Sequence, residues 1–380
     1  MIRNVRIENY KSISDLSIDL GRITVLIGAN GSGKSNILEA IAFASAAAQN
    51  KLENEFLSSR GIRVTESQFM RSAFERTPTP GHTIEISVKG EGDITFVCGL
   101  SADETASYPK WKKNYTPRLR EIMSDLFTKI FLREFDLKKL DEAFATIPGM
   151  LESVLTGKAG TLPGFLIYAP ENSALRTFQA EGQILPLGIR GEGLFAHLKG
   201  LNSEKHRDRL ETIKEKLRLI DWFESFDIPA DLSPGERSIR IRDRYLPDGA
   251  LFDQRSANEG FLFLLFYMTL LISPETPAFF SIDNVDTSLN PKLCIALIQE
   301  FVTLAKEYDK QVILTTHNPA ILDGLNLHDD EQRLLVVDRN KDGHTRVLRV
   351  DPPKPAPGRQ RVNLSEAFMR GYIGGLPDNF

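Results

Sequence analysis

From residue 260 onward, the pattern of apolar positions alternates between the helical and the strand period. The run "FLFLLFYMTLLI" at 261–272 is apolar on every side and too short to span a bilayer, so it predicts a buried core helix. The pattern then predicts a strand at 278–282, a helix at 292–308 and a strand at 311–316. Such alternation is typical of an α/β sheet with parallel members.

The rest of the chain predicts more strands and a charged helical region. Two strands, "IRNVRIENY" and "RITVLIG", open the chain and precede the helix "SNILEAIAFASAAAQ". Residues 82–100 alternate around a Gly-Glu-Gly-Asp turn, which predicts an antiparallel hairpin with one solvent-exposed face. From about 108 to 158 the pattern is helical and charged, without the sustained heptads of a long coiled coil. Residues 237–253 and 331–350 predict two further hairpins.

The amino-acid composition predicts a compact protein that folds in a reducing compartment. The 380 residues are 41% hydrophobic, which is ample for a substantial core. The net charge is -4, so any nucleic acid binding needs a local basic patch. Cys98 and Cys294 are far apart and form no metal-binding pair, which argues against a zinc site and a disulfide framework. With no apolar signal region at the N-terminus, we expect a cytoplasmic protein without a membrane segment.

A phosphate-binding loop is the most specific motif in the sequence. Residues 28–35, "GANGSGKS", fit the P-loop pattern and lie between an apolar strand and a helix. Glycines let backbone N–H groups surround phosphates, Lys34 reaches the β and γ oxygens, and Ser35 ligates magnesium. This context outweighs the alternative of a plain glycine-rich turn, and it predicts ATP or GTP binding with Mg. The predicted nucleotide-binding residues are Gly28, Asn30, Gly31, Ser32, Gly33, Lys34, Ser35 and Asn36.

The stretch 279–291, "FFSIDNVDTSLNP", has the outline of a Walker B strand and its following turn. Asp283 follows four largely apolar residues and is suited to hold a magnesium ion. Asn284 stands at the next position, where ATPases of this type usually carry a catalytic glutamate. The strand "QVILTTH" then ends at His317, and ligands of α/β sheets gather at the carboxyl ends of strands.

Together these segments resemble the ABC-type ATPase heads of the RecF, SMC and OLD group, within the AAA family ATPases of the AAA_21 kind. The resemblance rests on the opening with its Tyr-Lys-Ser element, on "PLGIRGEGLFAHLKGL", on "DNVDTSLNP" and on "VILTTHNPAILD", and it spans nearly the whole chain. It implies a P-loop NTPase fold of the α/β class, with a mixed parallel sheet, an antiparallel hairpin subdomain and a helical insertion.

The resemblance also implies a domain organisation. One ATPase head would occupy residues 1–350, followed by a proline-rich strap and tail at 351–380. Within the head we expect an N-terminal lobe at 1–100, a helical insertion at about 101–225 and a C-terminal lobe at about 226–350.

Specific roles follow from the resemblance. Asp283 would orient Mg through water, and His317 would contact the γ-phosphate, with a surface or core histidine as the alternative. Gln68 is the candidate Q-loop residue and Mg contact, and a solvated loop glutamine is an equal alternative. The signature motif is assigned to Asn258 and Gly260 at the start of the apolar helix, with Ser256 as a substitute for the usual serine. The other candidate, "LSPGERSIR" at 232–240, is followed by strand residues and therefore offers no helix N-terminus.

Asn284 bears on whether ATP is hydrolysed. An asparagine can hydrogen-bond the attacking water but cannot take its proton, and general base catalysis contributes about 10²- to 10⁴-fold in rate. We therefore expect slow hydrolysis. Asp286 is the nearest carboxylate that could compensate, and the alternative is that Asn284 merely caps a turn.

The expected partners follow partly from the residues and partly from the resemblance. ATP binding would join copies of the chain in an ATP-sandwich homodimer or a higher oligomer. The stretch after His317 is too short for a nuclease domain, so we expect a separate effector protein, such as a nuclease, in phage defence or DNA repair. Two basic segments are candidates for nucleic acid, with a solvated helical lid as the alternative for the first. They contain Lys110, Lys112, Lys113, Arg118 and Arg120, and Arg240, Arg242 and Arg244. The alternative function is a non-hydrolysing scaffold that holds ATP.

Overall fold

The computed structural model describes residues 1–72, 74, 83–91, 95–102, 110–114, 160–177, 184–229, 239–247, 249–352 and 363–376. The chain divides into two compact units, each built from separate stretches of sequence. Unit 1 comprises Met1–Gly21, Asn30–Phe165 and Val337–Leu348. Unit 2 comprises Arg22–Ala29, Leu166–Val336 and Arg349–Phe380.

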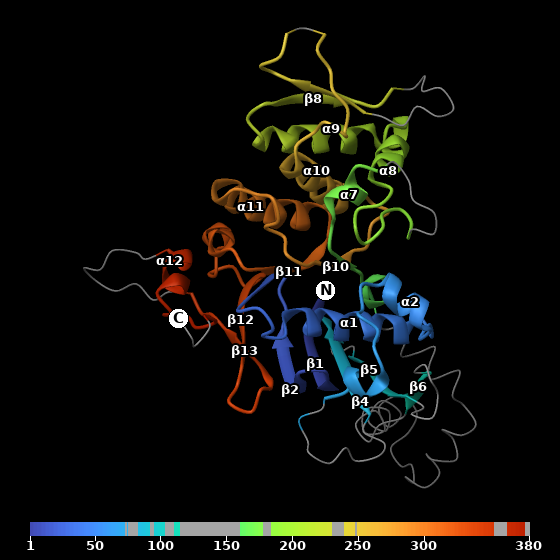
Figure 1. Ribbon diagram of the computed structural model, residues 1–380, viewed down its shortest axis with the longest axis vertical. Helices are drawn as coiled ribbons and strands as arrows, with labels where there is room; N and C mark the ends of the chain where they lie inside the picture. The colour runs from blue at the N-terminus through green and yellow to red at the C-terminus, as the bar shows by residue number, and fades with distance from the viewer. Residues whose placement is uncertain are drawn as a thin grey trace. The chain divides into compact units, whose positions relative to one another are not determined.

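Unit 1 is built on an antiparallel sheet with the strand order β2-β1-β4-β5-β6 within the described residues. Its strands are β1 (Ile2–Tyr10), β2 (Ile13–Asp19), β4 (Ile84–Gly90), β5 (Thr95–Ala102) and β6 (Trp111–Asn114). Helix α1 (Lys34–Ala48) contacts β1, β4 and β5 and covers this sheet (Figure 1). The shorter elements are α2 (Asn54–Ser59), α3 (Ser67–Met70) and the 3-10 turn η2 (Leu162–Gly164).

The hairpin predicted at 82–100 is present as β4 and β5, but its predicted wet face is wrong. All residues from 84 to 88 and from 96 to 100 are buried. Both strands lie in the interior of the sheet, where β4 pairs with β1 on one side and β5 pairs with β6 on the other. An inner strand that is covered on both faces loses the alternation that an edge hairpin would show.

Two further strands of unit 1 differ from the sequence prediction. β2 was not predicted, although its apolar residues Ile13, Leu16 and Ile18 are buried and its polar residues are exposed. Residues 111–114, predicted to be helical, form β6, because the buried Trp111 ring packs edge-on against Phe43 of α1 at a centroid distance of 5.0 Å. The remainder of the predicted helical region lies outside the described residues.

Unit 2 contains a parallel sheet in the order β12-β3-β11-β10-β7, with β13 next to β12. Its strands are β3 (Ile23–Ile27), β7 (Ile167–Tyr168), β10 (Phe279–Ile282), β11 (Gln311–Thr316) and β12 (Gln332–Arg339). β12 and β13 (Thr345–Arg349) form the predicted terminal hairpin, and the outer part of this hairpin belongs to unit 1. The strands predicted from the apolar runs are therefore confirmed.

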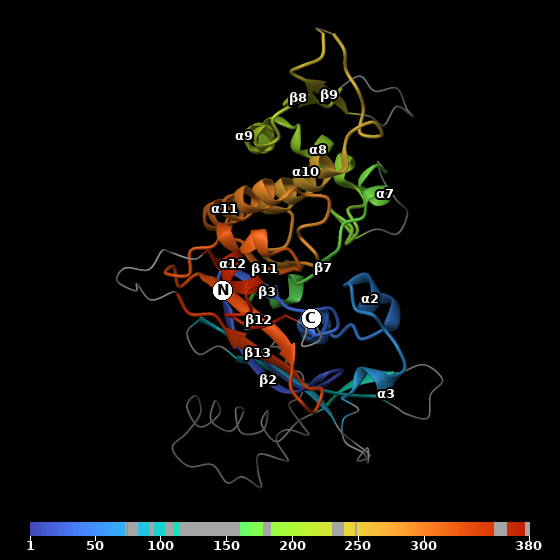
Figure 2. The ribbon, with the colours of Figure 1, turned by 60° about the vertical axis from the view of Figure 1, so that its left-hand side comes forward.

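Two long helices pack on this sheet. α10 (Glu259–Ile272) is buried from Phe261 to its end, as its uniformly apolar sequence predicts. α11 (Pro291–Glu307) begins with an Asn290 cap and Pro291 in its first turn, both favourable at a helix start. Both views show the two helices between the parallel sheet and the β8–β9 pair (Figures 1 and 2).

The remaining elements of unit 2 are short. They are α7 (Asn172–Leu175), α8 (Leu194–Leu201), η3 (Glu204–His206), α9 (Arg207–Lys216), η4 (Leu217–Leu219), β8 (Phe223–Asp227), β9 (Arg240–Asp243), η5 (Pro319–Gly324) and α12 (Leu364–Met369). The hairpin predicted at 237–253 is only partly correct. β9 pairs mainly with β8, and a single bridge from Ile241 to Phe252 joins it to the following segment.

Candidate functional site

The P-loop connects β3 with α1, and its backbone conformation depends on glycine. Gly31 and Gly33 have φ angles of 74° and 115°, in the left-handed region that other residues rarely adopt. A Cβ atom on Gly33 would lie 2.1 Å from Thr345 Oγ1, so no side chain fits there. The first two residues of the loop belong to unit 2, and Asn30 onward belongs to unit 1.

Three consecutive carbonyls of the P-loop accept hydrogen bonds from the protein. Arg339 Nε donates to Gly31 O (2.8 Å), Thr345 Oγ1 donates to Ser32 O (3.1 Å) and Ile37 N donates to Gly33 O (3.1 Å). Ser32 is buried, and its Oγ has no partner among the described residues. An orphaned buried hydroxyl in a glycine-rich loop, followed by the buried Lys34 at a helix N-terminus, fits the phosphates of a nucleotide.

Asn36 has a supporting position rather than a ligand-facing one. Its Nδ2 donates to Ser12 Oγ (2.7 Å), and its Oδ1 accepts from Arg63 Nη2 (3.0 Å). The side chain predicted to contact nucleotide is therefore engaged on both sides by unit 1 itself. Ser12 is the serine of the Tyr-Lys-Ser element.

The other two residues of that element hold a buried carboxylate on α1. Glu39 is 2% exposed and contacts Lys11 Nζ, Arg63 Nε and Tyr10 Oη. Burial raises the pKa of Tyr10, and the charge of Glu39 raises it further. Burial also lowers the pKa of Lys11, against the opposing effect of Glu39. A buried carboxylate is costly without such partners, so this cluster ties α1 to β1 at a fixed position.

In unit 2, the carboxyl ends of β10 and β11 bring the other predicted catalytic residues together. The two strands are parallel neighbours, with Ile282 opposite Leu314. Thr315 Oγ1 donates to the Asp283 carboxylate, and the N–H of Asp283 donates to Tyr168 O (2.8 Å). His317 follows β11 directly and is exposed at the same end.

Asn284 occupies a turn position with a left-handed backbone. Its φ is 54°, its side chain is exposed, and its carbonyl accepts from Thr287 Oγ1 (2.8 Å). Asparagine tolerates this conformation better than most residues. Asp286 accepts a hydrogen bond from Thr316 Oγ1 (2.6 Å), so the carboxylate considered as a substitute base is already engaged.

The assigned signature residues begin α10. Asn258 Oδ1 accepts from Phe261 N (2.8 Å), which caps the helix and accounts for the asparagine at this position. A Cβ on Gly260 would lie 3.2 Å from Ser288 O, so glycine allows the turn after β10 to approach closely. Glu259, between them, accepts from Ser288 Oγ (2.7 Å) and Asn172 Nδ2 (2.6 Å).

Arg176 fixes the segment before this helix, and sequence reasoning did not find it. Its guanidinium donates to the carbonyls of Gln254 (2.8 Å), Arg255 (2.6 Å) and Ala257 (2.8 Å). A pocket of about 860 Å³ adjoins the helix start and is lined in part by Trp222, Glu259 and Lys292.

Two family models of ATPase domains match separate parts of the chain. The family model "AAA ATPase domain" matches residues 1–144, and the family model "AAA domain, putative AbiEii toxin, Type IV TA system" matches residues 163–323. Over these two ranges the chain is therefore similar to AAA-type ATPase domains. A search of curated protein sequences finds no match.

The fold of the chain is similar to that of an SMC head. A crystal structure of an SMC head bound to the C-winged helix domain of ScpA superposes with a TM-score of 0.54 at 14% identity, covering 92% of this chain and 98% of that one. An SMC head from Thermotoga maritima has 15% identity and a TM-score of 0.47, with coverages of 92% and 99%. An SMC head with an extended coiled coil, bound to the C-terminal domain of ScpA and derived from Pyrococcus furiosus, has 14% identity and a TM-score of 0.49, with coverages of 92% and 96%. The first of these confirms the predicted α/β P-loop fold.

Gln68, the residue predicted to form the Q-loop, has no contact that indicates this role among the described residues. Gln68 is an exposed residue of the four-residue helix α3. Its Nε2 donates a hydrogen bond to Oε2 of Glu66 (2.6 Å), two residues earlier. No other partner of the Gln68 side chain is present in the described part of the chain, so its Q-loop and Mg roles stay predictions.

The two basic segments are only partly described. Lys112 and Lys113 lie on β6, with Lys110 just before it, whereas Arg118 and Arg120 lie outside the described residues. Arg240 and Arg242 are exposed on one face of β9, as the strand alternation predicts. Arg244 follows the strand and donates to Phe223 O (3.2 Å). Most of the rejected signature candidate at 232–240 also lies outside the described residues.

The described ranges contain no group of three or more His, Cys, Asp and Glu residues placed to hold a metal ion. They also contain no helix with the length and apolarity that crossing a membrane requires.

Proposed function

We propose that this ATPase domain is a cytoplasmic switch that binds Mg-ATP, hydrolyses it slowly and controls a separate effector protein. One observation carries the proposal: an intact P-loop is combined with Asn284 in place of a carboxylate at the exposed end of β10. The residues needed to bind nucleotide are present, whereas the residue needed to activate water cannot accept a proton. The bound state then persists long enough to act as a signal.

The P-loop residues supply the binding energy. Backbone N–H groups of 28–35 and the N-terminus of α1 would hold the β- and γ-phosphates, with Lys34 adding a charge. Ser35 and Asp283 would hold Mg²⁺, which neutralises phosphate charge when it is bound. Thr315 keeps the Asp283 carboxylate oriented, and His317 would contact the γ-phosphate.

We also propose that ATP promotes a homodimer through the signature segment. The N-terminus of α10 carries a positive dipole end, and Asn258 caps it with its own side chain. Because Asn258 is committed to this cap and Glu259 adds a negative charge, the attraction for a partner's nucleotide is weaker than a serine signature would give. Dimerisation should therefore be readily reversible.

The effector is assigned by analogy. A head of this fold binds the winged-helix domain of ScpA, which supports a protein partner for this chain as well. We propose a nucleic-acid-directed effector in phage defence or DNA repair, with the exposed Arg240 and Arg242 as the described candidates for nucleic acid contact. A second function, an ATP-bound scaffold without turnover, is favoured by the same Asn284.

Equilibrium binding of a fluorescent ATP analogue and a phosphate-release assay test this proposal. Wild type should bind in the presence of Mg²⁺ and release phosphate slowly, and Lys34→Ala should abolish both signals. If the protein binds the ATP analogue but releases no phosphate, with or without DNA, the result supports the scaffold function. Absence of nucleotide binding by the wild-type protein would refute both functions. Lys341→Ala, a lysine change on the exposed β12–β13 turn, is the control for nonspecific loss of charge.

A further inference from the structure

A directed chain of hydrogen bonds ends on the part of the P-loop that belongs to unit 1. It begins at Arg63 Nη2, which donates to Asn36 Oδ1 (3.0 Å), and continues from Asn36 Nδ2 to Ser12 Oγ (2.7 Å). Ser12 Oγ lies 2.6 Å from Thr345 Oγ1, which donates to Ser32 O (3.1 Å). The chain therefore joins β13 and the Tyr-Lys-Ser element to the phosphate loop.

The protons in this chain have one consistent direction. Thr345 has a single hydroxyl proton, which is used on Ser32 O, so the proton between Thr345 and Ser12 must come from Ser12. Ser12 Oγ in turn accepts a hydrogen bond from Asn36 Nδ2. Arg63 fixes the orientation of this amide by donating to its oxygen. Ser12, Thr345 and Ser32 are all at most 5% exposed. Bonds aligned this way in a buried setting strengthen one another, and loss of one member leaves others unsatisfied.

The bonds at the carbonyls determine where the P-loop N–H groups point. In a trans peptide the carbonyl and the next N–H point in opposite directions. Thr345 draws Ser32 O to its side, so Gly33 N–H points away from Thr345. Arg339, which donates to Gly31 O (2.8 Å), directs Ser32 N–H away from itself in the same manner. These are N–H groups of the loop that a P-loop offers to phosphate.

Steric contact reinforces this orientation. The Thr345 side chain fills the space beside the Gly33 α-carbon, where a Cβ would approach its Cγ2 to 2.8 Å. The N–H of Thr345 also donates to Ser12 O (2.7 Å), so backbone and side chain both hold this residue against the loop.

We propose that Thr345 and Ser12, together with Arg339, are positioning residues that orient the P-loop N–H groups toward the phosphates of the nucleotide. This inference rests on the proposed nucleotide binding and adds the residues that set its affinity. None of the three needs to touch the nucleotide. Their effect passes through the peptide planes of residues 31–33.

The test compares Thr345→Val with Thr345→Ser in equilibrium binding of ADP and of a fluorescent ATP analogue. Valine keeps the shape and removes the donor, so nucleotide affinity should fall about 10-fold or more, as for an unsatisfied buried carbonyl. Serine restores the hydroxyl and should recover most of the affinity. Thr303→Val is a matched control, because Thr303 is exposed on α11 and donates only to Gln299 O (3.0 Å) within its own helix.

Further variants keep the test decisive. Ser12→Ala should reproduce the loss, and the double variant with Thr345→Val should lose little more, since both interrupt one chain. If Thr345→Val does not fold, Ser12→Ala and Arg339→Ala carry the test. Wild-type affinity in folded Thr345→Val and Ser12→Ala would overturn the inference while leaving nucleotide binding intact. If the wild-type protein binds no nucleotide, the proposed function fails, and this inference fails with it.

Discussion

The backbone N–H of Asn284 donates to Thr315 Oγ1 over 2.9 Å, which fixes the turn after β10 to the end of β11. The same hydroxyl donates to Asp283, so one threonine orients both Asp283 and the residue after it. Asn284 has a φ of 54° in this arrangement. A glutamate at this position has to adopt the left-handed conformation, at a cost of about 1 kcal/mol.

We predict that Asn284→Glu raises ATP hydrolysis by about 10²- to 10⁴-fold, because the carboxylate can accept the proton of the attacking water. The midpoint of unfolding should fall at the same time, owing to the strained backbone. Phosphate release and thermal denaturation measure the two effects. Asn284→Gln is the control: it carries the same strain without a base, so it should lose stability and gain no activity. A rate for Asn284→Glu at or below that of wild type would contradict this account.

The sequence predicted the parallel sheet of unit 2 well and the antiparallel sheet of unit 1 less well. β3, β10 and β11 are buried throughout and contain short apolar runs, which can be recognised without knowledge of the neighbouring strands. β6 lies inside a charged segment, and its strand state depends on packing of Trp111 against Phe43, which local propensity does not encode. β9 pairs mainly with β8, whereas the Pro-Asp-Gly turn after β9 favoured pairing with the segment that follows it in sequence.

The candidate site shows the same limit. Motif residues were found because they are contiguous in sequence, as in the P-loop and in Asp283 with Asn284. Thr345 lies 313 positions from Ser32, and Arg176 lies 78 positions from Gln254, so no motif spacing indicates either contact. Asn36 directly follows the motif, but its role as a support became clear only from its partners Ser12 and Arg63.

Arg176 is predicted to stabilise the segment that starts α10. Arg176→Ala removes the donors to three carbonyls between 254 and 257, and we expect a loss of about 1–3 kcal/mol. Hydrogen exchange should show faster exchange in residues 254–261, and ATP-dependent dimerisation should weaken. Arg190→Ala is the control, because its guanidinium is 60% exposed and lies 3.7 Å from the exposed Glu171. Equal effects of the two variants would exclude a specific role for Arg176.

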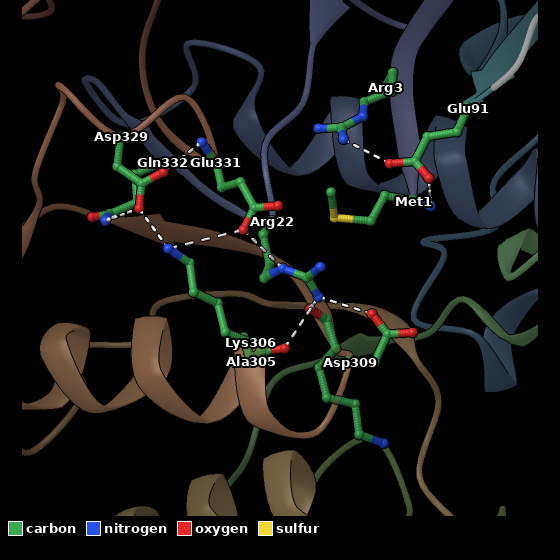
Figure 3. A network of polar contacts seen from close by, with 11 residues as sticks. Met1, Arg3, Arg22, Glu91, Ala305, Lys306, Asp309, Asp329, Glu331 and Gln332 are labelled. Atoms are coloured by element: carbon green, nitrogen blue, oxygen red, sulfur yellow. Dashed lines mark hydrogen bonds and ion pairs between the residues drawn. The ribbon is translucent and has the colours of Figure 1, made fainter.

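Arg22 directly precedes β3, the strand that leads to the P-loop. We predict that its hydrogen bonds to several acceptors of unit 2 stabilise the start of this strand (Figure 3). It donates to Glu331 Oε2 (3.1 Å), Ala305 O (3.2 Å) and Lys310 O (3.2 Å), as well as to Asp309 Oδ1 (3.0 Å). Arg22→Ala leaves partly buried carbonyls without this donor, so denaturant unfolding should show a loss of about 1–3 kcal/mol.

Asp309→Ala separates the surface ion pair from the rest of this network. The Asp309 side chain is 90% exposed, and exposed ion pairs contribute about 0–1 kcal/mol. We therefore expect Asp309→Ala to stay close to wild type in the same titration. If it lost as much stability as Arg22→Ala, the ion pair rather than the carbonyl contacts would be the anchor.

His197 gives the protein a predictable loss of stability in weak acid. Its Nε2 lies 2.8 Å from Ser273 Oγ at the end of α10, and its Nδ1 lies 3.4 Å from the Glu275 carboxylate. Burial lowers the pKa of His197 below its ordinary value of 6.5, although Glu275 opposes the shift. Between the lowered folded pKa and about 6.5, the unfolded chain binds a proton that the folded protein does not.

Stability should therefore decrease as the pH falls from about 6.5 toward the folded pKa of His197 and become independent of this group below it. His197→Gln has no titrating ring and keeps a polar group near Ser273, so the free energy of unfolding should fall less steeply over this interval. Urea titrations between pH 7.5 and 5 measure the slope, and His328→Gln, a change at an exposed histidine, is the control. Because burial is the dominant cause of the pKa shift, a slope for His197→Gln as steep as that of wild type would show that protonation of His197 is not what destabilises the fold in acid.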